Sequence, residues 1–196
     1  MLNEKKLIEL LKKNSESAFV ELYNKYSSVL FGICLRYSKE QTEAEDILQE
    51  SFIRIYKNIG SFKSEGSLEG WLKRIVVNVS INHYRKKIKE NTVSSDDEVI
   101  YEESVPENVF SELTSKELVK LIQLLPEGYR IVFNLYAIEG FKHNEIAEMM
   151  GFTESTSKTQ LMKAKKMLQQ YVFKLYPKIA KAYTESDKDK KLIFDF

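Results

Sequence analysis

Apolar residues recur every three or four positions along most of this chain, the spacing that places them on one face of an α-helix. The predicted helices cover residues 4–13, 15–37, 42–59, 67–89, 111–125, 126–140, 143–150 and 154–176. Seven glycines and three prolines are few, and no Asn-Gly or Asp-Gly pair indicates a β-hairpin. The pattern therefore predicts an all-α fold.

Polar residues at the helix starts support these boundaries. Asn14 or Ser15 can cap the second helix, because a side-chain oxygen there accepts from a free backbone N–H. Thr42 should start the third helix, with Glu45 completing a capping box, and Ser67 should cap the fourth. Within the third and fourth helices we expect these residues to be buried: Leu48, Phe52, Ile55, Ile59, Leu68, Leu72, Ile75 and Val79.

The helices fall into two small domains joined by a flexible acidic linker. Residues 91–110 lack helical periodicity and are rich in Ser, Asp and Glu, which is typical of a flexible segment. The predicted organisation is a helical domain at 1–90, the linker at 91–110, a second helical domain at 111–176 and a tail at 177–196.

The net charge of +1 hides an uneven distribution. Residues 69–90 hold six basic side chains against two acidic ones, and residues 158–181 hold seven lysines and no acid. Between them, residues 91–117 hold eight acidic side chains against one lysine. Two basic segments suggest two contacts with a polyanion, although ordinary solvated helix faces would have the same composition.

Several classes of protein are excluded or disfavoured. Cys34 has no partner for an internal disulfide, and no Cys or His spacing suits a metal. The N-terminal residues lack the apolar core of a signal peptide, and no apolar run approaches the roughly 18 residues of a membrane span. His83 and His143 are isolated from any nucleophile. We expect a cytoplasmic protein that is not an enzyme and has no cofactor, metal or small-molecule substrate.

Residues 139–168 predict a helix-turn-helix, formed by a short helix, a turn at Gly151 and a longer helix. In the longer helix, Leu161, Ala164 and Leu168 share one face, which should pack on the domain. The opposite face carries Lys158, Thr159, Met162, Lys163 and Lys166. A recognition helix needs an apolar side that fixes its angle and hydrogen-bond donors that enter the major groove. A plain helical hairpin is the alternative.

Residues 42–59 present a polar stripe made by Asp46, Gln49, Glu50 and Ile53, at positions i, i+3, i+4 and i+7. This stripe is either solvated surface or a docking face for a basic partner helix.

A third segment combines the loop at residues 60–66 with the helix that follows. Trp71, Arg74, Asn78 and Arg85 share a face of that helix. An exposed aromatic ring can stack on a base while cations hold phosphates, which is how proteins capture single strands or flipped bases. Alternatively, Trp71 belongs to the core.

Together the three segments resemble the extracytoplasmic-function (ECF) class of bacterial sigma factors, over residues 15–89 and 110–172. AEDILQESFIRIYKNI is similar to the helix that docks on RNA polymerase in the family's second region. SFKSEGSLEGWLKRIVVNVSINHYRKK is similar to its strand-opening loop and helix. LPEGYRIVFNLYAIEGFKHNEIAEMMGFTESTSKTQLMKAKKML is similar to its fourth region.

The resemblance implies a factor that binds core RNA polymerase and directs promoter-specific initiation, with an anti-sigma factor as a further partner. The implied polymerase-binding residues are Asp46, Gln49, Glu50 and Ile53. The implied contacts with the −10 element of promoter DNA are Phe62, Lys63, Ser64, Arg74, Asn78 and Arg85. The implied contacts with the −35 element are Lys158, Thr159, Met162 and Lys163.

Two positions in the predicted recognition helix depart from the family's pattern. Ser157 stands where an aliphatic residue is usual, and Gln160 stands where Arg is common. Two other functions remain open from the residues alone. One is a conventional helix-turn-helix regulator that binds an operator as a dimer, and the other is a sigma mimic that only sequesters an anti-sigma factor.

Overall fold

The structure is a computed structural model that describes residues 3–90 and 114–177 of the 196-residue chain. In these two ranges every regular element is a helix, so the predicted all-α fold is confirmed there. A boundary between Lys87 and Ile88 divides the chain into two compact units. The predicted linker, 91–110, and all but the first residue of the predicted tail, 177–196, lie outside the described residues.

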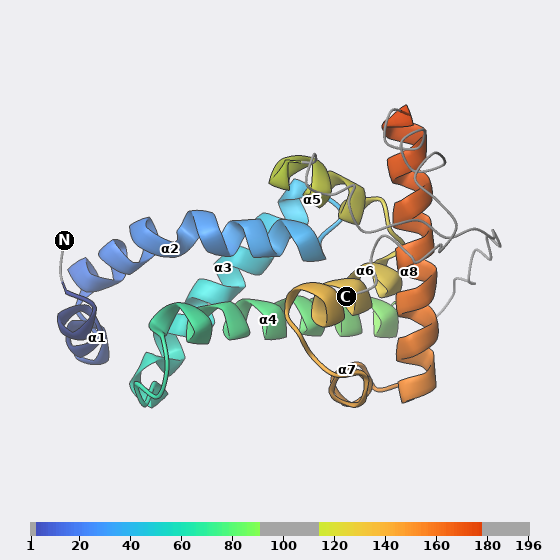
Figure 1. The fold of residues 1–196 in the computed structure, drawn as a ribbon. Helices are drawn as coiled ribbons and strands as arrows, with labels where there is room; N and C mark the ends of the chain where they lie inside the picture. The colour runs from blue at the N-terminus through green and yellow to red at the C-terminus, as the bar shows by residue number, and fades with distance from the viewer. Residues whose placement is uncertain (1–2, 91–113, 178–196) are drawn as a thin grey trace. The chain divides into compact units, whose positions relative to one another are not determined.

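The described part of the first unit is a helical bundle (Figure 1). Its elements are α1 (Glu4–Lys12), α2 (Glu16–Tyr37), α3 (Gln41–Asn58), the 3₁₀ turn η1 (Ile59–Ser61) and α4 (Leu68–Glu90). α2 and α3 pack against each other, and α3 crosses α2 at an angle. Leu22, Leu30, Ile47, Ile55 and Leu72, from α2, α3 and α4, are fully buried. Burial of each such side chain favours folding by roughly 1.5–3 kcal/mol.

Two of the predicted helix caps are present in this unit. The Ser15 hydroxyl accepts from the Ala18 N–H at 3.4 Å, and the Ser67 hydroxyl accepts from the Gly70 N–H at 3.0 Å. The prediction for the third helix is wrong. α3 begins at Gln41, so Thr42 lies inside the first turn, where its hydroxyl cannot act as a cap. The N-cap residue is Glu40, which makes no side-chain cap, and the Glu43 carboxylate accepts from the Lys39 N–H just before the helix at 2.9 Å.

Two predicted core residues are partly exposed. Leu48 and Ile75 were expected inside, but their neighbours Ile47 and Val76 take the buried positions. Adjacent residues on a helix differ by about 100° in direction. Where two neighbours are both apolar, the pattern alone cannot decide which of them faces the core.

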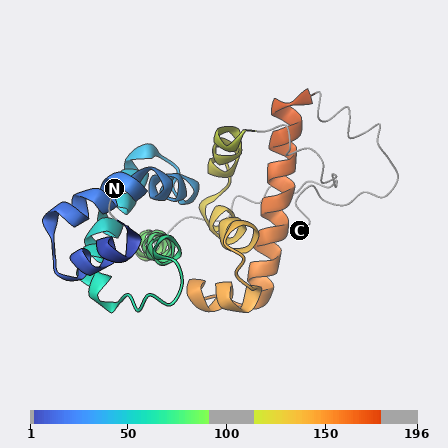
Figure 2. The ribbon, with the colours of Figure 1, turned by 60° about the vertical axis from the view of Figure 1, so that its left-hand side comes forward.

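The second unit contains the predicted helix-turn-helix. Its described elements are α5 (Ser115–Gln123), α6 (Glu127–Phe133), the π-helical turn η3 (Asn134–Ile138), α7 (His143–Met150) and α8 (Glu154–Leu175). Figure 2 shows α7 lying across the N-terminal end of the longer helix α8. Leu161, Ala164 and Leu168 on α8 are buried as predicted. None of the described helices is long and apolar enough to cross a membrane.

A buried arginine joins α5 to α6, which the sequence did not predict. The Arg130 side chain is 1 % exposed, and its Nη1 donates to the carbonyl oxygens of Gln123 at 3.1 Å and Leu125 at 3.2 Å. The Gln123 carbonyl belongs to the last turn of α5, where carbonyls lack intrahelical partners, and the Leu125 carbonyl belongs to the short connection that follows. The two hydrogen bonds fix the direction in which α6 follows α5.

The turn between α7 and α8 depends on a left-handed residue. Gly151 has φ = +77°, and its N–H donates to the Ala147 carbonyl at 2.9 Å. The Phe152 N–H donates to the same carbonyl at 3.2 Å. This C-terminal cap ends α7 and turns the chain into α8.

Gly151→Ala should lower the free energy of unfolding of the second unit by about 1–2 kcal/mol. A Cβ at this position meets nothing within 4 Å, so the cost comes from the backbone conformation alone. Gly32→Ala is the matched control, because Gly32 lies inside α2 with the same open space. It should stabilise the first unit by about 0.5–1 kcal/mol. Urea unfolding of both variants measures the two effects, and an equal sign for both would contradict the explanation.

Candidate nucleic-acid and partner interfaces

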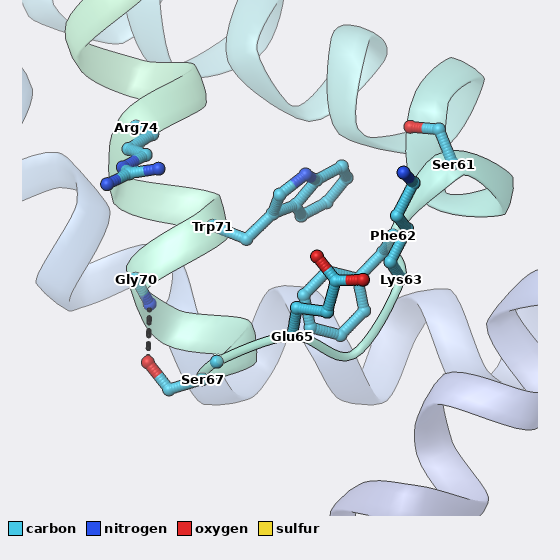
Figure 3. Close-up of a pocket in the computed structure, with 9 residues that line it drawn as sticks. Ser61, Phe62, Lys63, Glu65, Ser67, Gly70, Trp71 and Arg74 are labelled. Atoms are coloured by element: carbon cyan, nitrogen blue, oxygen red, sulfur yellow. Dashed lines mark hydrogen bonds between the residues drawn. The ribbon is translucent and has the colours of Figure 1, made fainter.

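A pocket opens between the loop after η1 and the first turns of α4 (Figure 3). Its volume is about 390 Å³. Its walls carry aromatic, cationic, acidic and hydroxyl groups. The lining residues are Ser61, Phe62, Lys63, Glu65, Gly66, Ser67, Gly70, Trp71 and Arg74. Three of these, Phe62, Lys63 and Arg74, were predicted to contact the −10 element.

Two aromatic rings form one wall of this pocket. The Phe62 ring is 4 % exposed and lies 5.4 Å from the Trp71 ring, centroid to centroid, at 47°. Trp71 is only half-buried, so it is neither a core residue nor a fully exposed one. Of the two rings, Trp71 therefore has the face that a planar ligand could cover, and Phe62 supports it from inside.

The loop reaches this position through two residues with positive φ. Ser64 has φ = +60° and Gly66 has φ = +105°. The Phe62 N–H donates to the Ile59 carbonyl at 3.1 Å, which ends η1 and starts the loop. Ser64 does not line the pocket, although we predicted a contact there.

The charged groups at the pocket are open to solvent. Lys63, Glu65 and Arg74 are exposed, and none of them makes an ion pair or hydrogen bond to another described residue. Lys73, next to Arg74, is paired with Glu69 at 2.7 Å. Figure 3 shows Arg74 and Lys63 on opposite sides of Trp71. Their charges are available for a phosphate backbone that passes the pocket.

Asn78 and Arg85 lie farther along the exposed face of α4. Both side chains are exposed, as predicted. Neither of them lines the pocket, so Asn78 stands one helical turn beyond it. The predicted −10 contacts therefore form a pocket group and a separate pair along α4.

The four residues of the predicted docking stripe on α3 differ in exposure and in their contacts. Asp46, Gln49 and Ile53 are exposed, and the Ile53 side chain is 48 % accessible. Glu50 is part-buried, and its carboxylate contacts Arg54 at 2.5 Å and His83 of α4 at 3.1 Å. Glu50 therefore helps to join α3 to α4, and the other three residues form the open face.

An apolar groove that the sequence did not predict lies beside this open face. It has a volume of about 600 Å³ and runs between α2 and α3. Its lining residues are Phe19, Tyr23, Glu45, Leu48, Gln49, Phe52, Ile53 and Tyr56. The Phe19 and Tyr56 rings meet edge to face, with centroids 5.2 Å apart. Because Gln49 and Ile53 belong to both, the groove and the docking stripe form one continuous surface.

The predicted reading face of α8 is exposed. Lys158, Thr159 and Met162 are exposed, and Lys163 is half-buried with its ammonium 5.9 Å from the Tyr129 ring centroid. Lys158 pairs with Glu154 at 2.6 Å. An exposed ion pair of this kind contributes little to stability and can be exchanged for another partner.

Ser157, one of the two unusual positions, points away from that face. Its side chain is fully buried, and its hydroxyl lies 2.9 Å from Nδ1 of His143 at the start of α7. The His143 ring stacks on Tyr136, with centroids 4.4 Å apart at 20°. Burial, and then the nearby charge of Lys158, lower the pKa of His143 below its ordinary value. This contact holds α7 and α8 in register.

Comparison with known proteins matches both units to established families. The sequence model for sigma-70 region 2 matches residues 22–89, and that for sigma-70 region 4 matches residues 115–168. The ECF RNA polymerase sigma factor SigW of Bacillus subtilis is 33% identical over 175 residues, which cover 84% of this chain and 94% of SigW. The chain belongs to the ECF RNA polymerase sigma factors.

Two further proteins are similar to this chain. The ECF sigma-E factor of Haemophilus influenzae is 29% identical over 86% of this chain and 94% of its own length. Among solved structures, CnrH in complex with the cytosolic domain of CnrY has a TM-score of 0.46 at 18% identity, covering 86% of this chain and 96% of that one.

Membership of this family makes the chain a promoter-directing transcription initiation factor and not an enzyme. The region 2 match contains the pocket, the docking stripe and every lining residue of the groove except Phe19. The region 4 match contains the helix-turn-helix. Sequence reasoning missed the groove because two of its lining residues, Leu48 and Phe52, were assigned to the core. It missed Glu65 because a loop carboxylate has no periodic pattern.

The stability of the second unit should fall as the pH drops below about 6.5. The pKa of His143 is lowered in the folded chain, so the unfolded chain binds this proton more readily between the lowered pKa and the ordinary histidine value of 6.5. Above this window both states are neutral at His143 and the effect vanishes. Thermal unfolding of the wild type and His143→Gln at pH 7.5 and 5.5 measures the difference. Parallel losses in the two proteins would contradict this assignment.

Proposed function

We propose that this sigma factor contacts a promoter at two separate elements while it is bound to core RNA polymerase. The open face of α3 docks on the polymerase, the pocket beside Trp71 captures an unpaired base of the −10 element, and the exposed face of α8 reads the −35 element as duplex DNA. The observation that carries the proposal is the pocket, where a partly accessible tryptophan stands between Lys63 and Arg74, two cations that pair with none of the described residues.

The docking face would use Asp46, Gln49 and Ile53. An exposed isoleucine between polar groups has the character of an interface, because apolar contact supplies affinity while the acid and the amide set orientation. The adjoining groove extends the apolar area that a partner helix could cover. Glu50 would act indirectly, by holding α3 against α4 through His83.

Base capture would combine stacking with electrostatic attraction. A base stacked on an aromatic side chain gains about 1–3 kcal/mol, which helps to offset the cost of unstacking it from the duplex. Arg74, together with Lys63, would hold the adjoining phosphates, and Asn78 and Arg85 would extend this track along α4. Because phosphate contacts release counterions, promoter binding should weaken as salt concentration rises.

Duplex reading would use the N-terminal half of α8. Lys158 and Thr159 stand in its first two turns, the part of a recognition helix that meets base edges. Met162 offers an apolar contact, for example to a thymine methyl group, and Lys163 offers a donor. Ser157 does not take part in reading, because it is buried against His143.

An anti-sigma factor would act by covering the same open face of α3 and so competing with the polymerase. The place of action would be the cytoplasm, where promoters and polymerase are found.

The proposal as a whole is tested by in vitro transcription with core polymerase on a library of genomic fragments, with the start sites mapped. We expect a discrete set of start sites that share two upstream elements. A footprint on such DNA by the chain alone, with no gain from polymerase, would instead indicate a conventional helix-turn-helix regulator.

Asp46→Ala combined with Gln49→Ala should weaken binding to core polymerase by about tenfold or more, as interface truncations near the centre of a contact do. Glu16→Ala combined with Asn24→Ala is the matched control, because it removes one acid and one amide from exposed positions of α2. Binding of labelled protein to Bacillus subtilis core enzyme measures both, with circular dichroism as the check on folding. Equal affinity of the two double variants would refute the docking assignment.

Lys158→Ala and Lys163→Ala should each weaken promoter binding by the holoenzyme. A lysine on a base should cost about 1–3 kcal/mol at one position of the −35 element, whereas a lysine on a phosphate should weaken all sequences equally and reduce the salt dependence. Lys116→Ala removes an exposed charge from α5 and should leave binding unchanged. Wild-type promoter binding by both α8 variants would exclude this face.

A further inference from the structure

The first helix, α1, lies outside the part of the chain that matches sigma-70 region 2, which begins at residue 22. The exposed residues of α1 are all Glu or Lys, whereas Leu7 and Leu11 are buried. Because these two leucines are four residues apart, they share one face of the helix. The described elements against which α1 packs most closely are α2 and the 3₁₀ turn η1. The buried face of α1 therefore lies where the three elements meet.

A tight turn and a hydrogen bond between helices hold α1 against the start of α2 (Figure 1). The Ser15 N–H donates to the Leu10 carbonyl at 3.1 Å, and Asn14 between them has φ = +58°. The Tyr26 hydroxyl of α2 donates to the Glu4 carboxylate of α1 at 3.5 Å. Since α2 contributes to the core of the first unit, these contacts give α1 a fixed position.

The turn η1 is the point from which the pocket loop starts. Its first residue, Ile59, is buried, and the Ile59 carbonyl accepts the Phe62 N–H at 3.1 Å. The Phe62 ring in turn supports the Trp71 ring from inside the pocket, with centroids 5.4 Å apart. A displacement of η1 would therefore move Phe62 and withdraw the support of the Trp71 ring.

The position of η1 depends on packing against other elements. A 3₁₀ turn has poorer hydrogen-bond geometry than an α-helix, so it holds its own position weakly. α3 runs directly into η1, and α1 is the other described element that packs closely on it. Because α3 also carries the open docking face, α1 is the support of η1 that is separate from the proposed polymerase contact.

We infer that Leu7 and Leu11 are positioning residues for base capture. They act from α1 through η1 on Phe62, which supports the Trp71 ring. The inference rests on the base capture proposed for this pocket. Truncation of either leucine leaves a space into which the surrounding structure partly relaxes, so η1 can shift. Contacts that depend on orientation are sensitive to such shifts, because a misplacement of about 1 Å can cost roughly 100-fold.

The test uses the full-length protein in holoenzyme with Bacillus subtilis core polymerase. The probes are promoter fragments from the mapped start sites, each with one abasic position in either strand of the −10 element. The base dependence of a position is the yield of heparin-resistant open complexes on the intact promoter divided by the yield on the abasic fragment. This ratio does not change with the fraction of protein that is folded. For the wild type we expect one position with a base dependence of about tenfold, the size of one base stacked on an aromatic ring.

Leu7→Ala should lower the base dependence at this position to about threefold or less, because a displaced pocket holds the base less well. Leu7→Met should restore the wild-type value, since its side chain has a similar volume. Leu7→Val is the milder truncation for the same measurement should Leu7→Ala not fold, and it should lower the ratio in the same direction. Binding of each variant to core polymerase should equal that of the wild type.

Leu30→Ala is the matched control, because Leu30 is fully buried in α2 as Leu7 is in α1. The start of α2 faces the end of α3, where the Phe19 and Tyr56 rings meet at 5.2 Å. Leu30 lies about 16 Å farther along α2 than Phe19. Leu30→Ala should therefore lower stability, as measured by circular dichroism, and keep the wild-type base dependence. An equal fall in base dependence for Leu30→Ala and Leu7→Ala would overturn the inference.

Trp71→Ala separates this inference from the proposed function. If Trp71→Ala abolishes the base dependence and Leu7→Ala lowers none of it, the pocket captures a base and only the role of α1 is wrong. If α1 acts through the pocket, the double variant should lose no more than Trp71→Ala alone. If Trp71→Ala changes the base dependence at no position, the pocket captures no base and both proposals fall together.

Discussion

The burial of one ring determines the shape of the pocket in the first unit. Phe62 is almost completely covered, and the chain returns to the core at Leu68, which is fully buried. Only residues 63–67 are left to connect these anchors, and the connection requires the left-handed region at Ser64, which costs about 1–2 kcal/mol for a residue with a Cβ. The apolar anchors therefore fix where the polar groups of this loop can stand.

The second unit is held by directional polar contacts in addition to apolar packing. Arg130 satisfies two carbonyls at and just beyond the end of α5, and the His143 ring meets the buried Ser157 hydroxyl between α7 and α8. Hydrogen bonds of buried groups tolerate little change in geometry, because an unmatched partner pays the full cost of desolvation. They are well suited to fixing the angle at which a reading helix leaves its supporting helix.

The helices could be predicted because their patterns are local. Periodicity, caps such as Ser15 and the glycine at 151 each act within a few residues of the chain, and the observed helices follow them closely. The exceptions involve choices between neighbours or contacts across the sequence. Ile47, and not Leu48, faces the core, and this choice depends on how α3 packs against α2. Glu50 is part-buried because its carboxylate contacts His83, which is 33 residues away in the sequence. The groove between α2 and α3 is such a product of packing.

In the candidate site too, features set by local spacing could be predicted, and features set by packing between distant segments could not. Trp71 and Arg74 could be placed on one face of α4 by counting residues, whereas the closeness of Phe62 to Trp71 depends on how the loop folds back. Ser157 is a further example. The sequence marked it only as a departure from the family's pattern, and the structure shows that its hydroxyl occupies a buried site opposite the His143 imidazole.

Trp71 is the only tryptophan in the 196 residues, and it stands half-buried in the wall of the pocket. The chain therefore contains an intrinsic optical probe in the wall of the pocket itself. Indole emission depends on the polarity and mobility of its surroundings, so the fluorescence of the unlabelled protein would report on the arrival of a flat, aromatic molecule. Strand opening could then be followed in real time from the side of the protein, without a dye on the DNA.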